Sequence, residues 1–239
     1  HVSIAGLIGG GAIVARPGEV TLAHRGVLFL DELSLFRRDA LESLRGPLEE
    51  GVVRIARSGG VVTYPASFSL IAATNPCPCG YASSSHRGRG CRCTMRQLTA
   101  YQSVLSGPLL DRIDLQITLG RVSKEQLLEP SGGERSSFVR ERVEKARLMQ
   151  LERYGSATRT NANAPRRELD SFVDGNPSTK RLLGRAIDRH DLSGRGLTRV
   201  LRVARTIADL EGAGDVVAHH IDEALAFRVT FARGEAIDG

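Results

Sequence analysis

The stretch GVLFLDEL, residues 26–33, limits the possible folds more than any other part of the sequence. It places four apolar residues after a glycine and directly before Asp31 and Glu32. A short continuous apolar run bounded in this way is typical of a strand buried on both faces of a parallel sheet. Open α/β folds bind their ligands at the carboxyl edge of such a sheet, so the two acids are candidates for a functional site.

The segments that follow complete an α/β pattern. Residues 69–73, SLIAA, form a second apolar run, and residues 37–49 between the two runs carry apolar side chains at helical spacing. Residues 52–64 hold two apolar stretches around a Ser-Gly-Gly turn and predict a β-hairpin. A second hairpin or loop is expected over residues 7–18. We therefore predict an α/β fold with a parallel-sheet core and β-hairpin insertions.

The pattern changes near residue 130. Residues 127–137, LLEPSGGERSS, are rich in Pro, Gly and Ser, as segments between domains often are. After this segment the apolar residues recur at helical spacing, most clearly over residues 197–208. We expect an α/β domain over residues 1–130 and an all-α domain over residues 136–239.

The composition excludes several classes of protein. No stretch approaches the roughly 20 uncharged apolar residues of a bilayer span, and the first residues do not resemble a signal peptide. We therefore expect a cytoplasmic protein without a membrane partner. Four cysteines are too few for a secreted disulfide scaffold of 239 residues. The net charge is +6, and only three of the 33 basic residues are Lys. Abundant Arg suits phosphate binding, but it is equally compatible with a merely solvated surface.

Four residues could together form a nucleotide site. Asp31 could hold Mg²⁺ through water and Glu32 could polarise an attacking water, the two tasks that nucleotide hydrolysis demands. Asn75, just after the second apolar run, could position that water. Arg112, in the stretch LLDRID, could bind a phosphate held by a neighbouring subunit. Each residue also has a simpler interpretation: acids that favour a helix dipole, an Asn-Pro turn, and an ordinary ion pair.

Long stretches of the chain match one known family. They are RPGEVTLAHRGVLFLDEL, ALESLRGPLEEGVVRIARSGGVVTYPASFSLIAATNPCPCG, LSGPLLDRIDL, LSGRGLTRVLRVARTIADLEG and HHIDEALAFR. Through these stretches nearly the whole chain resembles the AAA+ ATPases of the magnesium-chelatase-like family, and in particular its ComM/YifB branch. The resemblance implies part of an AAA+ core of the P-loop type, followed by a helical lid.

The resemblance implies roles for the residues at the strand ends. Asp31 and Glu32 match the Walker B pair, in which Asp31 faces Mg²⁺ through water and Glu32 is the catalytic glutamate. Asn75 matches sensor 1. Asp31 and Asn75 would thus contact the bound nucleotide, and ATP and Mg²⁺ are the implied cofactors.

Two arginines complete the implied catalytic set. Arg112 matches the arginine finger of the LLDR motif, which acts across the interface of a homo-oligomeric ring, expected to be a hexamer. A rigid cation at that place stabilises the charge that develops on the phosphate. Arg195, in LSGRGL, matches sensor 2 on the lid and would also contact ATP. Arg199 and Arg202 on the same helix are alternatives for this role.

One part of the implied site does not occur in the sequence. The phosphate-binding loop G-x-x-x-x-G-K-[ST] requires a Gly-Lys pair, and the chain has none. The resemblance places that loop upstream of His1, so we expect the chain to be a C-terminal piece of a longer ATPase. Because the loop normally supplies most of the contacts to the phosphates, the piece alone is expected to bind ATP weakly or not at all.

The predicted hairpin carries a candidate DNA contact. In DNA-translocating relatives the corresponding hairpin projects into the ring pore and touches the nucleic-acid backbone. Arg54 and Arg57 lie beside its small tip residues, where arginine can bind phosphate. The alternative is that both arginines merely face solvent. DNA is accordingly an expected partner.

The four cysteines form two close pairs, Cys77-Pro78-Cys79 and Cys91-Arg92-Cys93. Four thiolates suit a tetrahedral Zn²⁺ site, which here would be structural rather than catalytic. A one-residue gap is less diagnostic than C-x-x-C, so zinc and free thiols remain equal alternatives. His219 and His220 are adjacent on a predicted helix and point about 100° apart, so we do not expect them to share a metal and interpret them as structural.

Three functions are compatible with these features. The first is an ATPase that couples ATP hydrolysis to DNA remodelling, as a helicase or in branch migration during recombination and natural transformation (competence). The second is a magnesium-chelatase-type ATPase subunit that remodels a partner protein for metal insertion into a tetrapyrrole. The third is a non-catalytic binding fragment. The cysteine segment and the stretches DELSLF and LRGPLEEG favour the first.

Overall fold

The chain forms two compact units, residues 1–113 and 114–236, and each has its own hydrophobic core. The first is α/β and the second is helical, which confirms the predicted fold class. The limits drawn from the sequence, 1–130 and 136–239, remain a prediction. In the part of the chain that the structure describes, no helix is both long and apolar enough to cross a bilayer. The computed structural model describes residues 2–11, 14–57, 60–82, 90–105, 107–120, 122–128 and 133–228.

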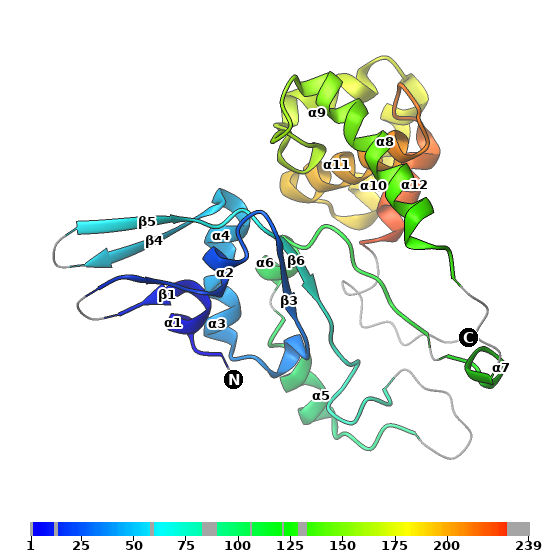
Figure 1. Ribbon diagram of the computed structural model, residues 1–239. Helices are drawn as coiled ribbons and strands as arrows, with labels where there is room; N and C mark the ends of the chain where they lie inside the picture. Colours follow the sequence, from blue (N-terminus) through cyan, green and yellow to red (C-terminus); the bar gives the residue numbers. More distant parts are fainter. Residues whose placement is uncertain are drawn as a thin grey trace. The chain divides into compact units, whose positions relative to one another are not determined.

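The first unit contains a two-stranded parallel sheet (Figure 1). It pairs β3 (Val27–Leu30) with β6 (Ser69–Ala72), which confirms the predicted parallel arrangement of the two apolar runs. The expectation that β3 is buried on both faces is wrong. Leu30 is 5% exposed, whereas Phe29 is 59% exposed. Successive side chains of a strand point to opposite faces, and only the Leu30 face packs against the described core.

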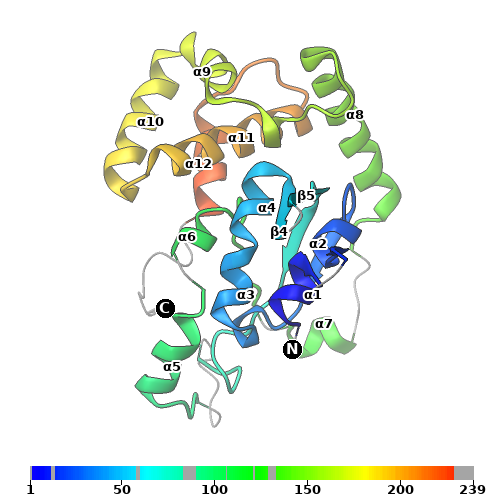
Figure 2. The same cartoon turned by 90° about the vertical axis from the view of Figure 1, so that its left-hand side faces the viewer.

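The helix predicted over residues 37–49 is divided into two. α3 spans Arg38–Ser43 and α4 spans Arg45–Glu50, with Leu44 between them. Figure 2 shows the two helices following one another end to end. Pro47 has no N–H to donate to the carbonyl four residues earlier, so the ladder of helical hydrogen bonds is interrupted at this point.

Two β-hairpins lie next to one another in this unit (Figure 1). β4 (Val52–Arg57) pairs antiparallel with β5 (Gly60–Pro65), as predicted, and residues 58 and 59 of the expected tip lie outside the described residues. β1 (Gly9–Gly10) and β2 (Arg16–Pro17) form the shorter upstream hairpin. The Tyr64 hydroxyl donates to the carbonyl of Ala15 at 2.8 Å and thereby joins the two hairpins.

Close backbone contact holds the base of the upstream hairpin. A Cβ atom on Gly18 would lie 2.4 Å from the nitrogen of Gly9 and 2.5 Å from the carbonyl oxygen of Leu7. Both distances are far inside van der Waals contact. Position 18 therefore accepts only glycine in this backbone arrangement.

Short helices complete the first unit. α5 begins with a capping box, in which the Thr94 hydroxyl accepts from the Gln97 N–H and the Gln97 side chain accepts from the Thr94 N–H. The remaining elements are α1 (Ile4–Ile8), α2 (Glu19–Leu22), the 3₁₀ helix η1 (Leu33–Leu35), α5 (Met95–Gln102) and α6 (Gly107–Leu110). The fully or nearly buried core residues are Leu7, Val20, Leu28, Leu30, Leu33, Leu41, Leu44, Val53, Ala66 and Leu109.

The second unit is built around α11, which packs against α8, α9 and α12 (Figure 2). The hydroxyl of Ser193 caps α11 by accepting from the Gly196 N–H at 3.0 Å. Val200, Leu201 and Ala204 are buried on one stripe of the helix, as the helical spacing predicts. The elements are α7 (Lys124–Leu128), α8 (Ser136–Tyr154), the 3₁₀ helix η2 (Asn161–Asn163), α9 (Arg166–Asp174), α10 (Pro177–His190), α11 (Gly194–Leu210) and α12 (Ala218–Ala226).

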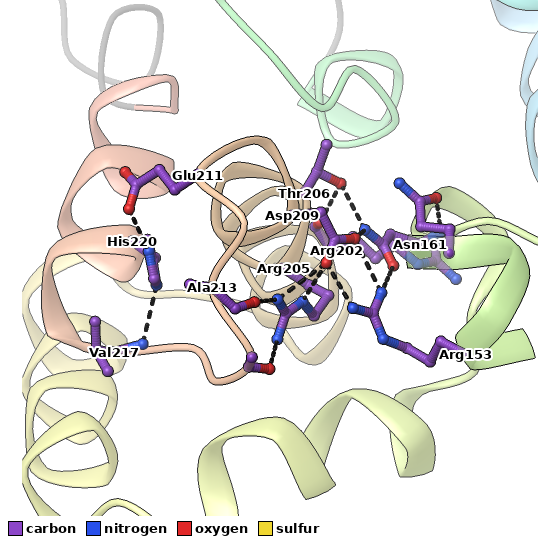
Figure 3. Close-up of polar contacts among 12 residues, drawn as sticks. Arg153, Asn161, Arg202, Arg205, Thr206, Asp209, Glu211, Ala213, Val217 and His220 are labelled. Atoms are coloured by element: carbon purple, nitrogen blue, oxygen red, sulfur yellow. Dashed lines mark hydrogen bonds and ion pairs between the residues drawn. The ribbon is translucent and has the colours of Figure 1, made fainter. Parts of the chain in front are cut away.

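A charged network is buried beside α11 (Figure 3). The Asp209 carboxylate accepts from Arg153 at 2.5 and 2.9 Å, from Nε of Arg205 at 3.1 Å and from Asn161 at 2.8 Å. It also forms an ion pair with NH2 of Arg205 at 2.9 Å. The side chains of Asp209 and Arg205 are both 0% exposed. Arg205 also donates to two backbone carbonyls of the loop after α11. The buried charges are thus paired and hydrogen-bonded, the condition under which burial of ions is tolerated.

Candidate functional site

The carboxyl ends of β3 and β6 form the first candidate site. Asp31 and Glu32 directly follow β3, and Asn75 lies three residues beyond the end of β6. The pairing of the two segments continues past the strands, because the Leu33 N–H donates to the Ala73 carbonyl at 2.8 Å. The structure therefore brings Asp31, Glu32 and Asn75 to one edge of the sheet, where all three are exposed.

Glu32 has an uncommon backbone conformation. Its φ and ψ are 50° and 46°, in the left-handed region, which costs a residue with a Cβ on the order of 1 kcal/mol or more. Asp31 holds the turn, because its Oδ1 accepts from the Glu32 N–H at 2.8 Å. Residues in such conformations cluster at functional sites. Among the described non-glycine residues, Glu32 shares a positive φ only with Arg25 and Asp191.

Three hydroxyl groups that the sequence analysis missed connect the strand ends to α5. Ser34 Oγ lies 2.7 Å from Thr74 Oγ1, which in turn lies 3.4 Å from Tyr101 Oη. Ser34 and Tyr101 are 5% and 9% exposed. Ser34 follows Glu32 by two residues and Thr74 directly precedes Asn75, so a hydroxyl residue close to each candidate was the available signal. No local pattern pointed to Tyr101.

Arg112 is turned into the first unit. It is 7% exposed, its NH2 lies 2.7 Å from Oε1 of Glu49, and its NH1 donates to the carbonyl of Pro108. The sequence left an ordinary ion pair and a contact to a neighbouring subunit as alternatives. The structure contains the ion pair, so a role across an interface would require Arg112 to leave Glu49.

The three candidate lid arginines have different surroundings in the second unit. Arg195 lies exposed in the first turn of α11. Arg199 forms an ion pair with Asp114. Arg202 donates from Nε and NH2 to the carbonyl of Ala164 at 3.2 and 2.9 Å, and its removal from water lowers the pKa of its guanidinium. Of the three, only Arg195 is exposed, and Arg199 and Arg202 are half-buried.

The two hairpin arginines also differ. Arg54 on β4 is exposed and forms an ion pair with Glu50, the last residue of α4. Arg57 is half-buried at the end of β4, and its guanidinium approaches Gly11 next to the upstream hairpin. The two arginines are three residues apart on β4, so their side chains leave opposite faces of the hairpin. Arg54 would exchange its bond to Glu50 for one to a phosphate.

The four cysteine sulfurs converge on one point and form the second candidate site. Each Sγ lies within 4.8 Å of the other three, and the separations are 3.3 Å for Cys77–Cys79 and 3.7 Å for Cys77–Cys91 and Cys79–Cys91. A tetrahedron of sulfurs about 2.3 Å from a zinc ion has edges of about 3.8 Å. The arrangement therefore fits a tetrahedral thiolate site, and the cysteines are not joined as disulfides.

The thiols of this cluster differ in acidity. Hydrogen bonds from the backbone N–H groups of Arg92 and Tyr81 lower the pKa of Cys79 to about 6. Partial removal from water and the facing thiols raise the pKa of Cys93 to about 12. Four thiolates this close repel one another, so full deprotonation requires a cation among them. The cluster could hold a soft divalent metal ion.

The adjacent histidines converge on a single carboxylate. The Nε2 atoms of His219 and His220 lie 3.0 and 2.9 Å from Oε2 of Glu211. Although the two side chains leave the helix in different directions, the rings turn toward each other and their centroids lie 4.0 Å apart. These hydrogen bonds hold the pKa of Glu211 below its ordinary value.

The hydrogen-bond network nevertheless disfavours a metal at the histidines. Nδ1 of His220 accepts from the Val217 N–H at 3.0 Å. A neutral imidazole that accepts at Nδ1 carries its proton on Nε2, so His220 donates to Glu211 (Figure 3) and offers no lone pair there. We assign the cluster a structural role, linking the end of α11 to the first turn of α12.

Comparisons with known proteins place the sequence in context. Residues 1–127 match the family described as magnesium chelatase, subunit ChlI, and residues 133–228 match the family described as magnesium chelatase, subunit ChlI C-terminal. The chain is 43% identical over 232 residues to an uncharacterized protein of Mycobacterium tuberculosis, covering 97% of this chain and 45% of that protein.

Two further relatives carry names. Competence protein ComM of Haemophilus influenzae is 40% identical over 227 residues, which are 95% of this chain and 43% of ComM. The uncharacterized protein YifB of Escherichia coli is 39% identical over 231 residues, with 95% of this chain and 43% of YifB covered. The chain thus spans less than half the length of these relatives.

Proposed function

This chain belongs to the magnesium chelatase subunit ChlI family, and on that basis we propose that it is part of an AAA+ ATPase that acts on DNA. The matches to ComM and YifB confirm the resemblance drawn from the motifs. The proposal gives the first unit the hydrolytic residues of the ATPase core and the second unit the role of its lid. Relatives of about twice the length leave room for the phosphate-binding loop outside residues 1–239.

The arrangement at the end of β3 carries the ATPase proposal. Two carboxylates follow one parallel strand and an amide follows its neighbour, the geometry in which open α/β sheets bind nucleotides. In the proposed reaction Asp31 orients the water shell of Mg²⁺, Glu32 polarises the attacking water and Asn75 holds that water at the γ-phosphate. The left-handed conformation of Glu32 supports a functional role, because the fold sustains an unfavourable backbone there.

Hydrolysis is tested on protein that includes the phosphate-binding loop. The coding sequence upstream of residue 1 should encode a glycine-rich loop ending in Gly-Lys-Ser or Gly-Lys-Thr. In that extended protein Glu32→Gln should lower kcat by at least about a hundredfold and leave nucleotide affinity near the wild-type value, since it removes a group used in the transition state. Glu19→Gln, which alters an exposed acid on α2, is the matched control.

The isolated chain provides an independent test. Calorimetric titration of the 239-residue protein with Mg-ATP should give no micromolar affinity, because the main phosphate contacts are absent from its sequence. A micromolar dissociation constant would show that the proposed division of the site is wrong. In the predicted case the isolated chain acts as a non-catalytic binding fragment.

DNA binding is proposed for the β4–β5 hairpin. Arg54 and Arg57 place two cations on one strand, and the resemblance to the ComM/YifB branch implies DNA as a partner. Replacing both with Ala should weaken DNA binding and reduce the slope of log K against log salt concentration by about 2, one per lost phosphate contact. A double replacement of Arg37 and Arg38, exposed cations at the start of α3, should leave the slope unchanged.

A chelatase-type activity is the second candidate, because the matching family profiles are described as magnesium chelatase subunits. In that case the ATPase would remodel a partner protein for metal insertion into a tetrapyrrole. The two candidates use the same residues at the sheet edge, but only the first requires DNA as a partner. Salt-dependent DNA affinity that survives in the extended protein supports the first, and its absence supports the second.

A ring of identical subunits, expected to be a hexamer, is part of the proposal. Arg112 would then reach the phosphates of a neighbouring subunit after exchanging its bond to Glu49. Arg195 would act as sensor 2 from the first turn of α11. Light scattering of the extended protein with Mg-ATP measures whether the ring assembles. Arg112→Ala should reduce kcat for ATP hydrolysis while the ring still assembles.

We also propose a structural Zn²⁺ at the four cysteines. The support is the convergence of the sulfurs at separations that fit a tetrahedral site. Metal analysis of protein purified without added metal should find about one zinc per chain. Four freely titrating thiols and no bound metal would instead establish the alternative of free cysteines.

A further inference from the structure

The cysteine cluster lies between the candidate hydrolytic edge and α5. Cys77 follows Asn75 by two residues, and Cys93 directly precedes Thr94, the residue that caps α5. A metal bound by all four sulfurs would therefore tie the end of the β6 segment to the start of α5. Along the chain the cluster is far from Asp31 and Glu32 but begins two residues after Asn75.

The other end of α5 returns to the same edge. Tyr101, in the last turn of α5, is 9% exposed and its Oη lies 3.4 Å from Thr74 Oγ1. Thr74 is hydrogen-bonded at 2.7 Å to Ser34, which follows Glu32 by two residues. The chain thus leads from Asn75 through the cysteines into α5, and Tyr101 at the end of α5 returns to Thr74. Thr74 and Asn75 are adjacent in the chain.

We propose that a thiophilic divalent cation at the four cysteines fixes α5 against the end of β6, so that Tyr101 positions Asn75 beside Glu32. Tyr101 and Thr74 are positioning residues in this arrangement. The metal-dependent contact stands on its own geometry, whereas its importance for hydrolysis rests on the proposed ATPase function.

The distances explain why the cation matters. At 3.4 Å the contact between Tyr101 and Thr74 is longer than a usual hydroxyl hydrogen bond, so a shift of α5 by a few tenths of an ångström makes or breaks it. Without a cation only weak thiol contacts join the four sulfurs, because the cysteines are not linked as disulfides. A cation bound by all four sulfurs would hold Cys93, and with it the start of α5, close to Cys77.

Two measurements on the 239-residue chain test the proposal. Cobalt titration follows the thiolate-to-metal absorption and gives the affinity of the cluster. Hydrogen exchange with and without Zn²⁺ follows the amides of Leu33 and Ala73, which bond to the carbonyls of Ala73 and Leu30 across the sheet edge. In the wild type Zn²⁺ should slow their exchange by about fivefold, the factor that one hydrogen bond of ordinary net strength provides.

Substitutions separate binding from coupling. Tyr101→Phe should keep the cobalt absorption and lose the Zn²⁺-dependent protection. Gln102→Ala, an exposed neighbour on the same helix, should keep both. Cys91→Ser should lose both. Protection that persists in Tyr101→Phe would overturn the role of Tyr101, and wild-type protein without thiolate-to-metal absorption would overturn the metal site.

The hydrolytic consequence has its own readout. In the extended protein Tyr101→Phe should lower kcat with KM unchanged, because Asn75 would be misplaced in the transition state rather than in nucleotide binding. An unchanged kcat together with lost amide protection would overturn the link to hydrolysis. If the extended protein has no ATPase activity at all, the proposed function fails while the exchange results still decide the metal-dependent contact.

Discussion

Replacing Asp209 with Asn removes a carboxylate that holds two buried arginines in the second unit. Asp209 accepts from Arg153, Arg205 and Asn161, and its side chain is 0% exposed. The amide keeps the size of the side chain but cannot neutralise Arg205, which is also fully buried. Removal from water already lowers the pKa of Arg205, which shows how poorly this position tolerates an unpaired cation.

The expected loss follows from breaking a buried ion pair on one side. Such changes cost about 3–5 kcal/mol, because the remaining charge stays buried without its partner. With a urea m-value of about 2 kcal/mol per molar, the unfolding midpoint should fall by roughly 1.5–2.5 M. Far-ultraviolet circular dichroism suits this measurement, because the second unit contains the longest helices of the described chain.

Two further variants sharpen this test. Asp222→Asn removes an exposed carboxylate from α12 and should change the midpoint little. A double variant, Arg205→Met with Asp209→Leu, removes the fully buried cation together with its partner and should lose less stability than Asp209→Asn, because Arg153, the other cation, is partly exposed. A loss below about 1 kcal/mol in Asp209→Asn would refute the reasoning, since the network would then add little to stability.

Three further predictions concern stability. The hydrogen bonds from His219 and His220 lower the pKa of Glu211 in the folded state, so this carboxylate contributes its full share of the free energy of unfolding above the ordinary pKa of 4.5. The contribution declines as the pH falls through the lower pKa of the folded state. Urea unfolding from pH 7 to pH 3 should therefore show a shrinking difference in free energy of unfolding between wild type and Glu211→Gln. Gly18→Ala should prevent formation of the upstream hairpin, seen as fast amide exchange over residues 7–18, because its Cβ would overlap Gly9. Ser193→Ala should cost about 1 kcal/mol in urea unfolding through loss of the α11 cap, whereas Ser193→Asn should cost little.

Local patterns predicted most of the fold. The two apolar runs around residues 27–30 and 69–73 indicated a parallel pair, and the glycine-centred stretch after α4 indicated the hairpin. The helix over residues 37–49 was predicted without its break, although Pro47 was the signal for one. The exposure of Phe29 could not be predicted from β3 alone, because it depends on what covers the sheet.

The placement of the candidate residues was predictable where they adjoin the strands and not where they come from distant segments. Asp31, Glu32 and Asn75 follow apolar runs, so strand topology was enough to bring them to one edge. Tyr101 approaches that edge from α5, and sequence spacing contains no information about this contact. The bond between Arg112 and Glu49 is likewise a tertiary contact. The left-handed conformation of Glu32 has no signal in residue type, since such positions favour Gly or Asn.

The exposed apolar face of the β3–β6 sheet favours self-association of the chain in solution. Val27, Phe29 and Ile71 are 57%, 59% and 52% exposed there, and in the described residues each strand pairs along only one edge. Flat apolar strands with an open edge act as templates for association with other chains. The net charge of +6 opposes that association through repulsion between molecules, and salt screens the repulsion. Colloidal stability of the isolated chain should therefore be greatest in dilute, low-salt solution.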